Sequence, residues 1–444
     1  MVKNKLISGA LVLSIGGIIT KFIGAIYRVP LTNILGAEGI GIYQMAFPFY
    51  ALLLTFSSTG VPNGIAKLIA ENDNAVSVIK SAVYVFCFMG LVLTALMACF
   101  SLNLARFQGN VNAWLCYLTL SPSVFLVSLI SCFRGLFQGY SDMKPTAVSQ
   151  IIEQFVKLIF GLTLCFAFRK NLILAVGSAT LAVTLSELVT AFYFIIKVKK
   201  RGVLKGFFKA KLQISLIIKT VFPMMTATLI IPLTRTVESF LIINILSGYL
   251  TNATGLYGLY SGAVESIISM PVSVCYGVAV SIVPIISKLK AKNQSYEKKS
   301  MQAINLTFLL SIIFGLTLIV FKDLIINVLY VKLSVENKIL ISKMLKISSL
   351  SVIGLSLMQT TVAIINASGN YKVSIFSGIV SATLKIIISI RLLKIQSLNV
   401  FGAIIADIFC YFVACFINLS YIIYSNLKKY PKTGAKCIKS QLSA

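Results

Sequence analysis

Long runs of apolar residues follow one another along this chain of 444 residues, and short polar segments separate them. A membrane-spanning helix needs about 20 consecutive apolar residues. The pattern therefore predicts an all-α polytopic membrane protein with about twelve transmembrane helices. The expected spans are Leu6–Arg28, Ile40–Leu68, Val76–Leu104, Ala113–Phe133, Thr146–Phe168, Leu172–Val198, Ile214–Leu246, Gly255–Leu289, Met301–Val320, Leu340–Asn366, Val373–Leu393 and Val400–Tyr424.

Composition supports the membrane class and narrows the chemistry. Hydrophobic residues make up 58% of the chain and charged residues 12%, with a mean hydropathy of +0.93. The nine cysteines show no C-x-x-C spacing, and the chain contains no histidine, so His-ligated metal and His acid–base chemistry are excluded. No nucleotide-binding G-x-x-x-x-G-K-[ST] motif occurs. We expect no catalytic residue, no metal site and no cofactor, and we interpret the N-terminus as a retained span, not a signal peptide.

The net charge of +28 comes from Lys and Arg in short loops between the spans. A nucleic-acid-binding protein would gather such residues on a soluble face, so we expect no nucleic-acid partner. An even number of spans places both termini on one side, and most loop cations lie on that side. By the positive-inside rule, both termini are predicted to be cytoplasmic.

The most basic segment, K-V-K-K-R-G-V-L-K-G-F-F-K-A-K, lies between the sixth and seventh spans. We interpret it as a topology determinant that contacts anionic membrane lipids. Short echoes relate the halves on either side: Val29–Thr32 recurs as Ile231–Thr234, and Asn33–Gly36 as Asn244–Ser247. Transporters are often built from such repeats. The predicted division is a six-helix lobe 1–198, a basic linker 199–213, a six-helix lobe 214–427 and a basic tail 428–444.

Prolines recur within three of the spans. Helix-breaking residues are tolerated in a membrane where neighbouring groups or water satisfy the freed backbone. We expect them to act as hinges or gates, and static kinks that fit the packing are the alternative. These prolines are Pro48, Pro62, Pro223, Pro232, Pro271 and Pro284.

The first span carries two cations inside an otherwise apolar helix. Ser14, Gly17, Lys21, Gly24 and Arg28 follow one another at spacings of three and four residues, so they share one narrow helix face. Cations in hydrocarbon normally face a bundle interior or a wet cavity. An anionic ligand would explain this face. The alternative is that Arg28 reaches an interface and Lys21 pairs with an acid elsewhere.

Acids and cations also share faces of later spans. Glu153 and Lys157 are four residues apart, and Arg235 and Glu238 are three apart, so both pairs can form ion pairs within one helix. Ion pairing and ligand binding both remain open for them. Many spans carry small polar stripes, which indicates a bundle that lines a large hydrated cavity. The other charged residues in such stripes are Glu187, Glu265, Lys385 and Asp407.

The intramembrane charges suggest two uses. Cations could neutralise a pyrophosphate, for which the planar guanidinium of arginine is suited. The candidate pyrophosphate ligands are Lys21, Arg28, Lys157 and Arg235. Acids could hold a coupling Na⁺ or H⁺, or balance the cations. The candidate acids are Glu153, Glu238, Glu265 and Asp407.

Three segments, Gly36–Tyr50, Gly60–Glu71 and Phe133–Gln154, resemble the stage V sporulation protein B branch of the multidrug/oligosaccharidyl-lipid/polysaccharide exporter superfamily, which includes Gram-positive lipid II flippases. The resemblance implies two six-helix lobes around a V-shaped cavity, as in multidrug exporters of that superfamily. In the flippases, cations of the first span and cavity bind pyrophosphate, which the resemblance assigns here to Lys21, Arg28 and Arg235. Members usually carry fourteen spans, two more than expected here, which implies another lipid-linked substrate or a shortened reading frame.

The expected function is a flippase that moves an undecaprenyl-pyrophosphate-linked saccharide, for peptidoglycan or spore cortex, across the bacterial plasma membrane by alternating access. We expect a monomer driven by Na⁺, H⁺ or the membrane potential. One alternative is a cation-coupled multidrug exporter of the same superfamily. Another is a membrane scaffold without transport, which would recruit cell-wall synthesis enzymes through its basic loops.

Overall fold

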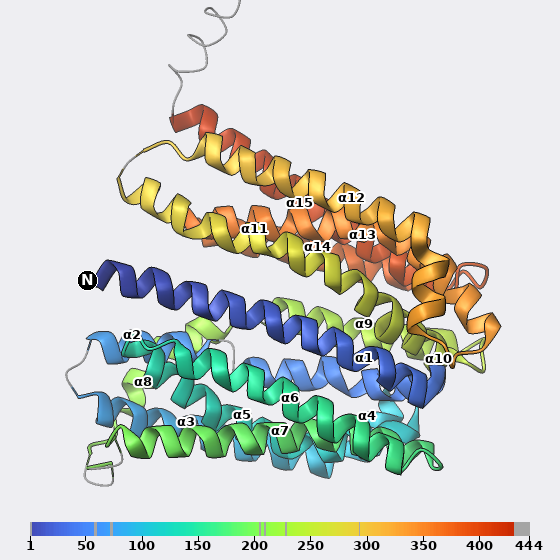
Figure 1. Cartoon of the computed structure of the whole chain (residues 1–444), viewed down its shortest axis with the longest axis horizontal. Coiled ribbons are helices and arrows are strands. Elements are labelled where there is room, and N and C mark those ends of the chain that lie inside the picture. Colours follow the sequence, from blue (N-terminus) through green and yellow to red (C-terminus); the bar gives the residue numbers. More distant parts are fainter. Residues whose placement is uncertain are drawn as a thin grey trace, which may run out of the picture.

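The computed structural model describes residues 2–56, 60–71, 74–203, 206–207, 210–226, 229–292 and 294–429, and these residues form helices and connecting turns without a strand. Figure 1 shows two groups of long, roughly aligned helices. The helices are α1 (Val2–Leu54), α2 (Val61–Glu71), α3 (Ala75–Cys99), α4 (Ser101–Phe107), η2 (Val111–Ala113), α5 (Trp114–Gly139), α6 (Lys144–Ala167), α7 (Leu172–Lys200), α8 (Ile214–Thr226), α9 (Ile230–Ser247), α10 (Ala253–Tyr257), η3 (Gly258–Val264), α11 (Glu265–Ala291), α12 (Glu297–Leu329), α13 (Val335–Ala367), α14 (Tyr371–Leu393) and α15 (Phe401–Lys429).

The predicted fold class is confirmed. Ten helical segments among the described residues are long and apolar enough to cross a membrane. Helix α1 consists of two arms, because Gly36 interrupts the helix with φ 69° and ψ −173°. A left-handed φ is readily adopted only by glycine, so this residue separates the first two expected spans.

Two of the expected spans are broken near their prolines. Helix α1 ends at Leu54 and α2 begins at Val61, with Pro62 in its first turn. Helix α8 ends at Thr226 and α9 begins at Ile230, with Pro232 in its first turn. Proline suits a first helical turn, where its missing N–H has no intrahelical partner anyway. The hinge roles stay predictions. Of the others, Pro48 lies inside α1, Pro271 and Pro284 lie inside α11, and the ring of Pro223 in α8 lies outside the described side chains.

Three buried apolar clusters hold the bundle together. The largest joins both halves and includes Ile40 and Ile42 of α1 together with Leu259 of η3. A second lies within the first half and joins α2, α3, α5, α7 and α8. A third lies within the second half and joins α11, α12, α13 and α15. The halves therefore share a core at one end and have separate cores at the end where the basic linker lies (Figure 1).

Helix α8 follows the basic linker in sequence but packs with the first half. Ile217 and Val221 belong to the same buried cluster as α2 and α3. The linker is attached there as well, because the Gln213 amide donates to Ser81 Oγ at 2.6 Å and Arg201 lies 3.5 Å from the Asp142 carboxylate. The second half proper, as judged by these contacts, begins with α9. The division into lobes at 198 and 214 stays a prediction, and all of the predicted tail beyond 429 lies outside the described residues.

The two halves contact each other through a matched pair of asparagines. Asn33 of α1 donates to Leu329 O at 2.6 Å and to Val29 O, four residues earlier. Asn244 of α9 donates to Phe107 O at 3.0 Å and to Phe240 O, again four residues earlier. Each asparagine thus belongs to one half and bonds the backbone of the other. These two residues begin the echoed segments Asn33–Gly36 and Asn244–Ser247, so the structure supports an internal repeat.

Close backbone contact seals this junction. A Cβ at Gly41 of α1 would lie 2.0 Å from Thr254 O of α10, and one at Gly258 would lie 2.4 Å from Ala37 O. Both obstacles are backbone atoms, which cannot rotate away as a side chain can. Glycine is therefore required at both positions for α1 to lie against α10 and η3, as Figure 1 shows.

We predict that Gly41→Ala opens the junction between the halves, since the methyl group cannot fit beside Thr254 O. Double electron–electron resonance between spin labels at the exposed residues Val111 and Val331 should give longer or broader distances in this variant. The matched control is Gly17→Ala, because nothing lies within 4 Å of a Cβ there. Equal distance distributions for the two variants would contradict the prediction.

Candidate functional site

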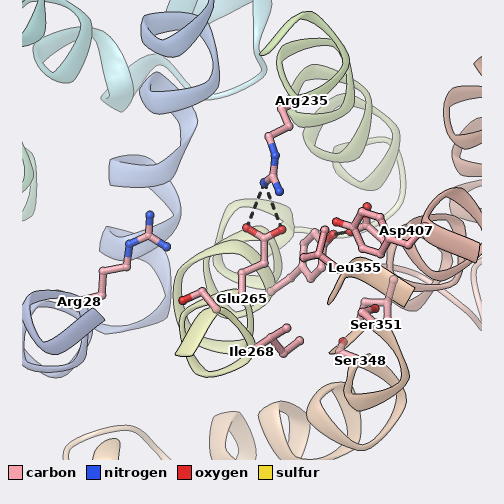
Figure 2. Close-up of a pocket in the computed structure, with 12 residues that line it drawn as sticks. Arg28, Arg235, Glu265, Ile268, Ser348, Ser351, Leu355 and Asp407 are labelled. Atoms are coloured by element: carbon pink, nitrogen blue, oxygen red, sulfur yellow. Dashed lines mark hydrogen bonds and ion pairs between the residues drawn. The ribbon is translucent and has the colours of Figure 1, made fainter. Parts of the chain in front are cut away.

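A cavity of about 230 Å³ lies where the first half faces the second. Arg28 of α1 lines one side of it, and residues from α9, η3, α11, α13 and α15 line the rest (Figure 2). Two cations, two acids and several hydroxyl groups face this space. The lining residues are Arg28, Arg235, Tyr260, Glu265, Ile268, Ser269, Ser348, Ser351, Leu355, Ile404, Asp407 and Tyr411.

Arg28 is the first-half cation of this cavity. Its Nη1 donates to Ser266 Oγ of α11 at 3.4 Å. Among the described residues, no carboxylate lies within ion-pairing distance of its guanidinium. Most of its five donors are therefore available to an anion that enters the cavity. In Figure 2 its side chain extends from α1 toward the space shared with Arg235 and Glu265.

Arg235 of α9 faces the same cavity but has an acidic partner. Its Nη1 lies 3.4 Å from Glu265 Oε1 and 3.5 Å from Oε2. The Arg235 side chain is 45% exposed and that of Glu265 is 24% exposed. Exposed pairs of this kind contribute only ~0–1 kcal/mol to stability, so an incoming anion can compete for the guanidinium. Of the two uses left open for Arg235 and Glu238, pairing with each other is not what the structure shows, because Glu238 pairs with Lys385.

Behind this pair lies a buried cluster of three charges. Lys385 Nζ of α14 lies 2.6 Å from Glu238 Oε2 of α9 and 2.5 Å from Asp407 Oδ1 of α15. All three side chains are less than 10% exposed. Tyr260 of η3 donates a hydrogen bond to Asp407 Oδ2. The cluster therefore ties four helical elements of the second half together beside the cavity, which Asp407 and Tyr260 also line.

The first half has its own ion pair, away from this cavity. Arg134 Nη2 of α5 lies 2.7 Å from Glu153 Oε2 of α6, and Arg134 Nε donates to Ser149 Oγ at 3.2 Å. Of the two uses left open for Glu153 and Lys157, pairing with each other is not what the structure shows, because Arg134 of the neighbouring helix pairs with the Glu153 carboxylate. Lys157 Nζ instead lies 5.6 Å from the ring centroid of Tyr27, in cation–π contact.

The structure thus brings together only some of the candidate residues. Arg28, Arg235, Glu265 and Asp407 line one cavity. Glu238 lies behind it, and Glu153 and Lys157 do not line it. The side chain of Lys21 lies outside the described part of the structure, although its backbone belongs to α1.

Sequence reasoning missed Arg134 and Tyr260, and it missed the partners of Lys385. Lys385 was recognised as an intramembrane cation, but nothing local identified its two partners. Arg134 lies in the F-R-G-L-F-Q-G-Y segment that supported the family resemblance, which was a usable signal. Tyr260 gave no signal, because a tyrosine in an apolar run looks like a core residue until its hydroxyl is placed.

The groups that line the cavity are suited to binding an anion. Among the described residues, no cluster of three or more His, Cys, Asp or Glu side chains could hold a metal ion. The described cavity instead offers one unneutralised guanidinium, a second that is loosely paired, and hydroxyl groups from Ser269, Ser348 and Ser351. Such groups recognise an anion with polar neighbours.

Solved structures with the same fold are transporters. The chain aligns with the inward-facing conformation of a multidrug resistance MATE family transporter of the MOP superfamily, with a TM-score of 0.74, 13% identity and coverage of 93% of this chain and 96% of that one. The outward-facing conformation of such a transporter gives a TM-score of 0.67 at 14% identity, over 96% of each chain. The expected MATE-like architecture is confirmed.

Relatives by sequence include two proteins of Bacillus subtilis (strain 168). Stage V sporulation protein B is 27% identical over 350 residues, which cover 74% of this chain and 68% of the relative. Lipid II flippase MurJ is 24% identical over 440 residues, which cover 91% of this chain and 80% of the relative. These findings confirm the resemblance to this branch, and the apolar helices confirm a multi-pass membrane protein. The family model for polysaccharide biosynthesis proteins matches residues 6–290, well over half of the chain, and the chain therefore belongs to the polysaccharide biosynthesis protein family.

Proposed function

We propose that this protein is a flippase that carries an undecaprenyl-pyrophosphate-linked saccharide across the bacterial plasma membrane, as a precursor of peptidoglycan or spore cortex. The observation that carries the proposal is Arg28, a cation inside the bundle that faces a cavity without a neutralising acid among the described residues. Keeping an unpaired cation among apolar helices is costly, which favours an anionic ligand. A relative that is a lipid II flippase and another that is a sporulation protein support this choice of substrate class.

The size of the cavity limits what it holds. At about 230 Å³ it is smaller than the ~300–1,000 Å³ that pockets for whole small molecules usually have. We infer that it takes the pyrophosphate, between Arg28 and Arg235, with Ser269 beside it. The saccharide and the lipid would extend beyond it, along the surfaces where the halves separate.

Alternating access follows from how the halves are joined. With both termini cytoplasmic, the junction at Asn33, Gly41 and Asn244 faces outward and the separate cores face the cytoplasm. We propose that this state opens toward the cytoplasm, the side from which such a flippase would take its substrate. We propose that the halves pivot at the break between α8 and α9, since α8 packs with the first half and α9 with α14 of the second.

The driving force is part of the same proposal. An anionic head group that crosses the membrane responds to the membrane potential, at ~2.3 kcal/mol per charge for each 100 mV. Exchange with H⁺ or Na⁺ through the membrane acids is the other route. No partner is needed for this cycle, and we propose a monomer that receives its lipid from cell-wall synthesis enzymes.

A cation-coupled multidrug exporter is the second candidate, because the structural neighbours include multidrug resistance transporters. An unneutralised Arg28 would repel cationic drugs, so this reading is weaker. A scaffold without transport has no specific observation in its favour, since the basic linker is attached to the first half at Arg201 and Gln213.

We predict that Arg28→Ala abolishes flipping while membrane insertion is retained. Hydrogen bonds to charged groups contribute ~1.5–3 kcal/mol each, so losing two would reduce pyrophosphate affinity at least a hundredfold. The assay measures lipid II exposed at the outer face of cells depleted of their own flippase. Arg169→Ala is the matched control, because Arg169 is an exposed cation stacked on Phe166. Full activity of Arg28→Ala would contradict the proposal, and drug resistance without lipid exposure would favour the exporter.

We also predict that Glu265→Gln strengthens pyrophosphate binding, by about two- to fivefold, because it frees Arg235 from an exposed pair that contributes at most ~1 kcal/mol. Calorimetric titration of the purified protein with inorganic pyrophosphate measures the change. Glu336→Gln, which removes an acid from the first turn of α13 outside the cavity, is the control. Weaker binding in Glu265→Gln would show that Glu265 helps to hold the ligand.

A further inference from the structure

The position between Glu238 and Asp407 is built to hold a positive charge. Carboxylates from two different helices, α9 and α15, direct one oxygen each at the same point, 2.6 and 2.5 Å from Lys385 Nζ. The Tyr260 hydroxyl bonds the other oxygen of Asp407, which keeps that carboxylate turned toward the point. Carboxylate oxygens are the ligands that hard cations prefer. In this chain, however, the cation there belongs to the protein.

The ammonium is confined to that place. The Lys385 side chain is 6% exposed, and Glu238 and Asp407 are 9% and 7% exposed, so burial and two carboxylates together hold the ammonium in this position. A tethered group has a high effective concentration at its own site. A free cation that approached these carboxylates would have to displace it and leave an unpaired ammonium in the bundle, which is strongly unfavourable.

Charge balance also gives the cluster an excess of one carboxylate. Glu238 Oε1 has no hydrogen-bond partner among the described residues, although the side chain is buried. The nearby Arg235 is engaged with Glu265 on the cavity side. Without Lys385, two buried carboxylates would face each other with no cation between them. Such a pair must take up a cation or a proton to persist in the bundle.

We propose that Lys385 is the resident cation of the second half, so that these carboxylates bind no exchangeable metal cation in the natural protein. Lys385 thereby sets the ion specificity of the second half. With Lys385 in place, the positive charge at these carboxylates belongs to the protein in every state of the transport cycle. Replacing the ammonium by an apolar side chain converts the same carboxylates into a site for Na⁺. This inference goes beyond the proposed flippase function and does not depend on the substrate.

The test measures unfolding temperature against Na⁺ concentration, for the full-length protein in nanodiscs, with N-methylglucamine replacing Na⁺ at constant ionic strength. The natural protein should show no saturable shift. Lys385→Met should unfold at a lower temperature without Na⁺ and recover saturably as Na⁺ is added, because ligand binding to the folded state stabilises it. Adding Asp407→Asn to Lys385→Met should remove that response.

Two controls keep the result specific. Lys372→Met removes an exposed lysine from the same helix and should behave as the natural protein. Lys385→Arg keeps the charge and should stay insensitive to Na⁺. A saturable Na⁺ shift in the natural protein that Asp407→Asn abolishes would overturn the proposal, even if Lys385→Met did not fold. A folded Lys385→Met that ignores Na⁺ would overturn it as well. Neither readout involves flipping, so failure here leaves the flippase proposal untouched.

Discussion

A charge inside a membrane bundle must be neutralised, and this requirement organises both halves of the protein. Arg134 and Glu153 join α5 to α6 in the first half, and Lys385 joins α9, α14 and α15 in the second. Each is fixed by a partner on another helix, so removing one partner leaves a charge that neither water nor lipid can accommodate. Arg28 and Lys157 have no carboxylate partner among the described residues, but Lys157 contacts the Tyr27 ring whereas Arg28 faces the cavity, and we therefore propose the cavity as the place for an anion.

The apolar clusters are shared between the halves at one end of the molecule and separate at the other. One buried cluster crosses between the halves near Ile40 and Leu259, whereas each half keeps a core of its own at the basic end. Closely packed cores resist gradual deformation, so a molecule with one continuous core would not separate readily. Two halves that share a core at one end and keep separate cores at the other could instead exchange one junction for another, as the proposed cycle requires. The asparagine pair adds polar bonds to that contact without filling it with bulky side chains.

The sequence predicted the features that depend on local chain properties. Span positions follow from hydrophobic runs, and helical spacing places Arg28 on a polar face of the first span. The break at Gly36 lies between the first two expected spans, although the sequence pattern did not single out this residue. Ion-pair partners could not be predicted in this way. The i,i+3 and i,i+4 rule suggests Glu238 as a partner for Arg235, but Arg235 pairs with Glu265, 30 residues away. Lys385 pairs with residues on two other helices. Helix packing determines which carboxylate comes close to a given cation, and residue spacing within one helix does not predict that packing.

The two halves share the frame of the internal repeat but differ in the charged residues at the cavity. Asn33 and Asn244 keep equivalent bonds in the two halves, so the frame of the repeat is symmetric. The cations are not. Aligning Val29–Thr32 with Ile231–Thr234 places Ile230 opposite Arg28, and aligning the asparagines places Ser239 there. Either way the second half lacks a free cation at this position and holds Arg235 in an ion pair instead. Under the proposed function, the symmetric frame would let the halves pivot, and the asymmetric charge would let one half hold the anion more firmly than the other.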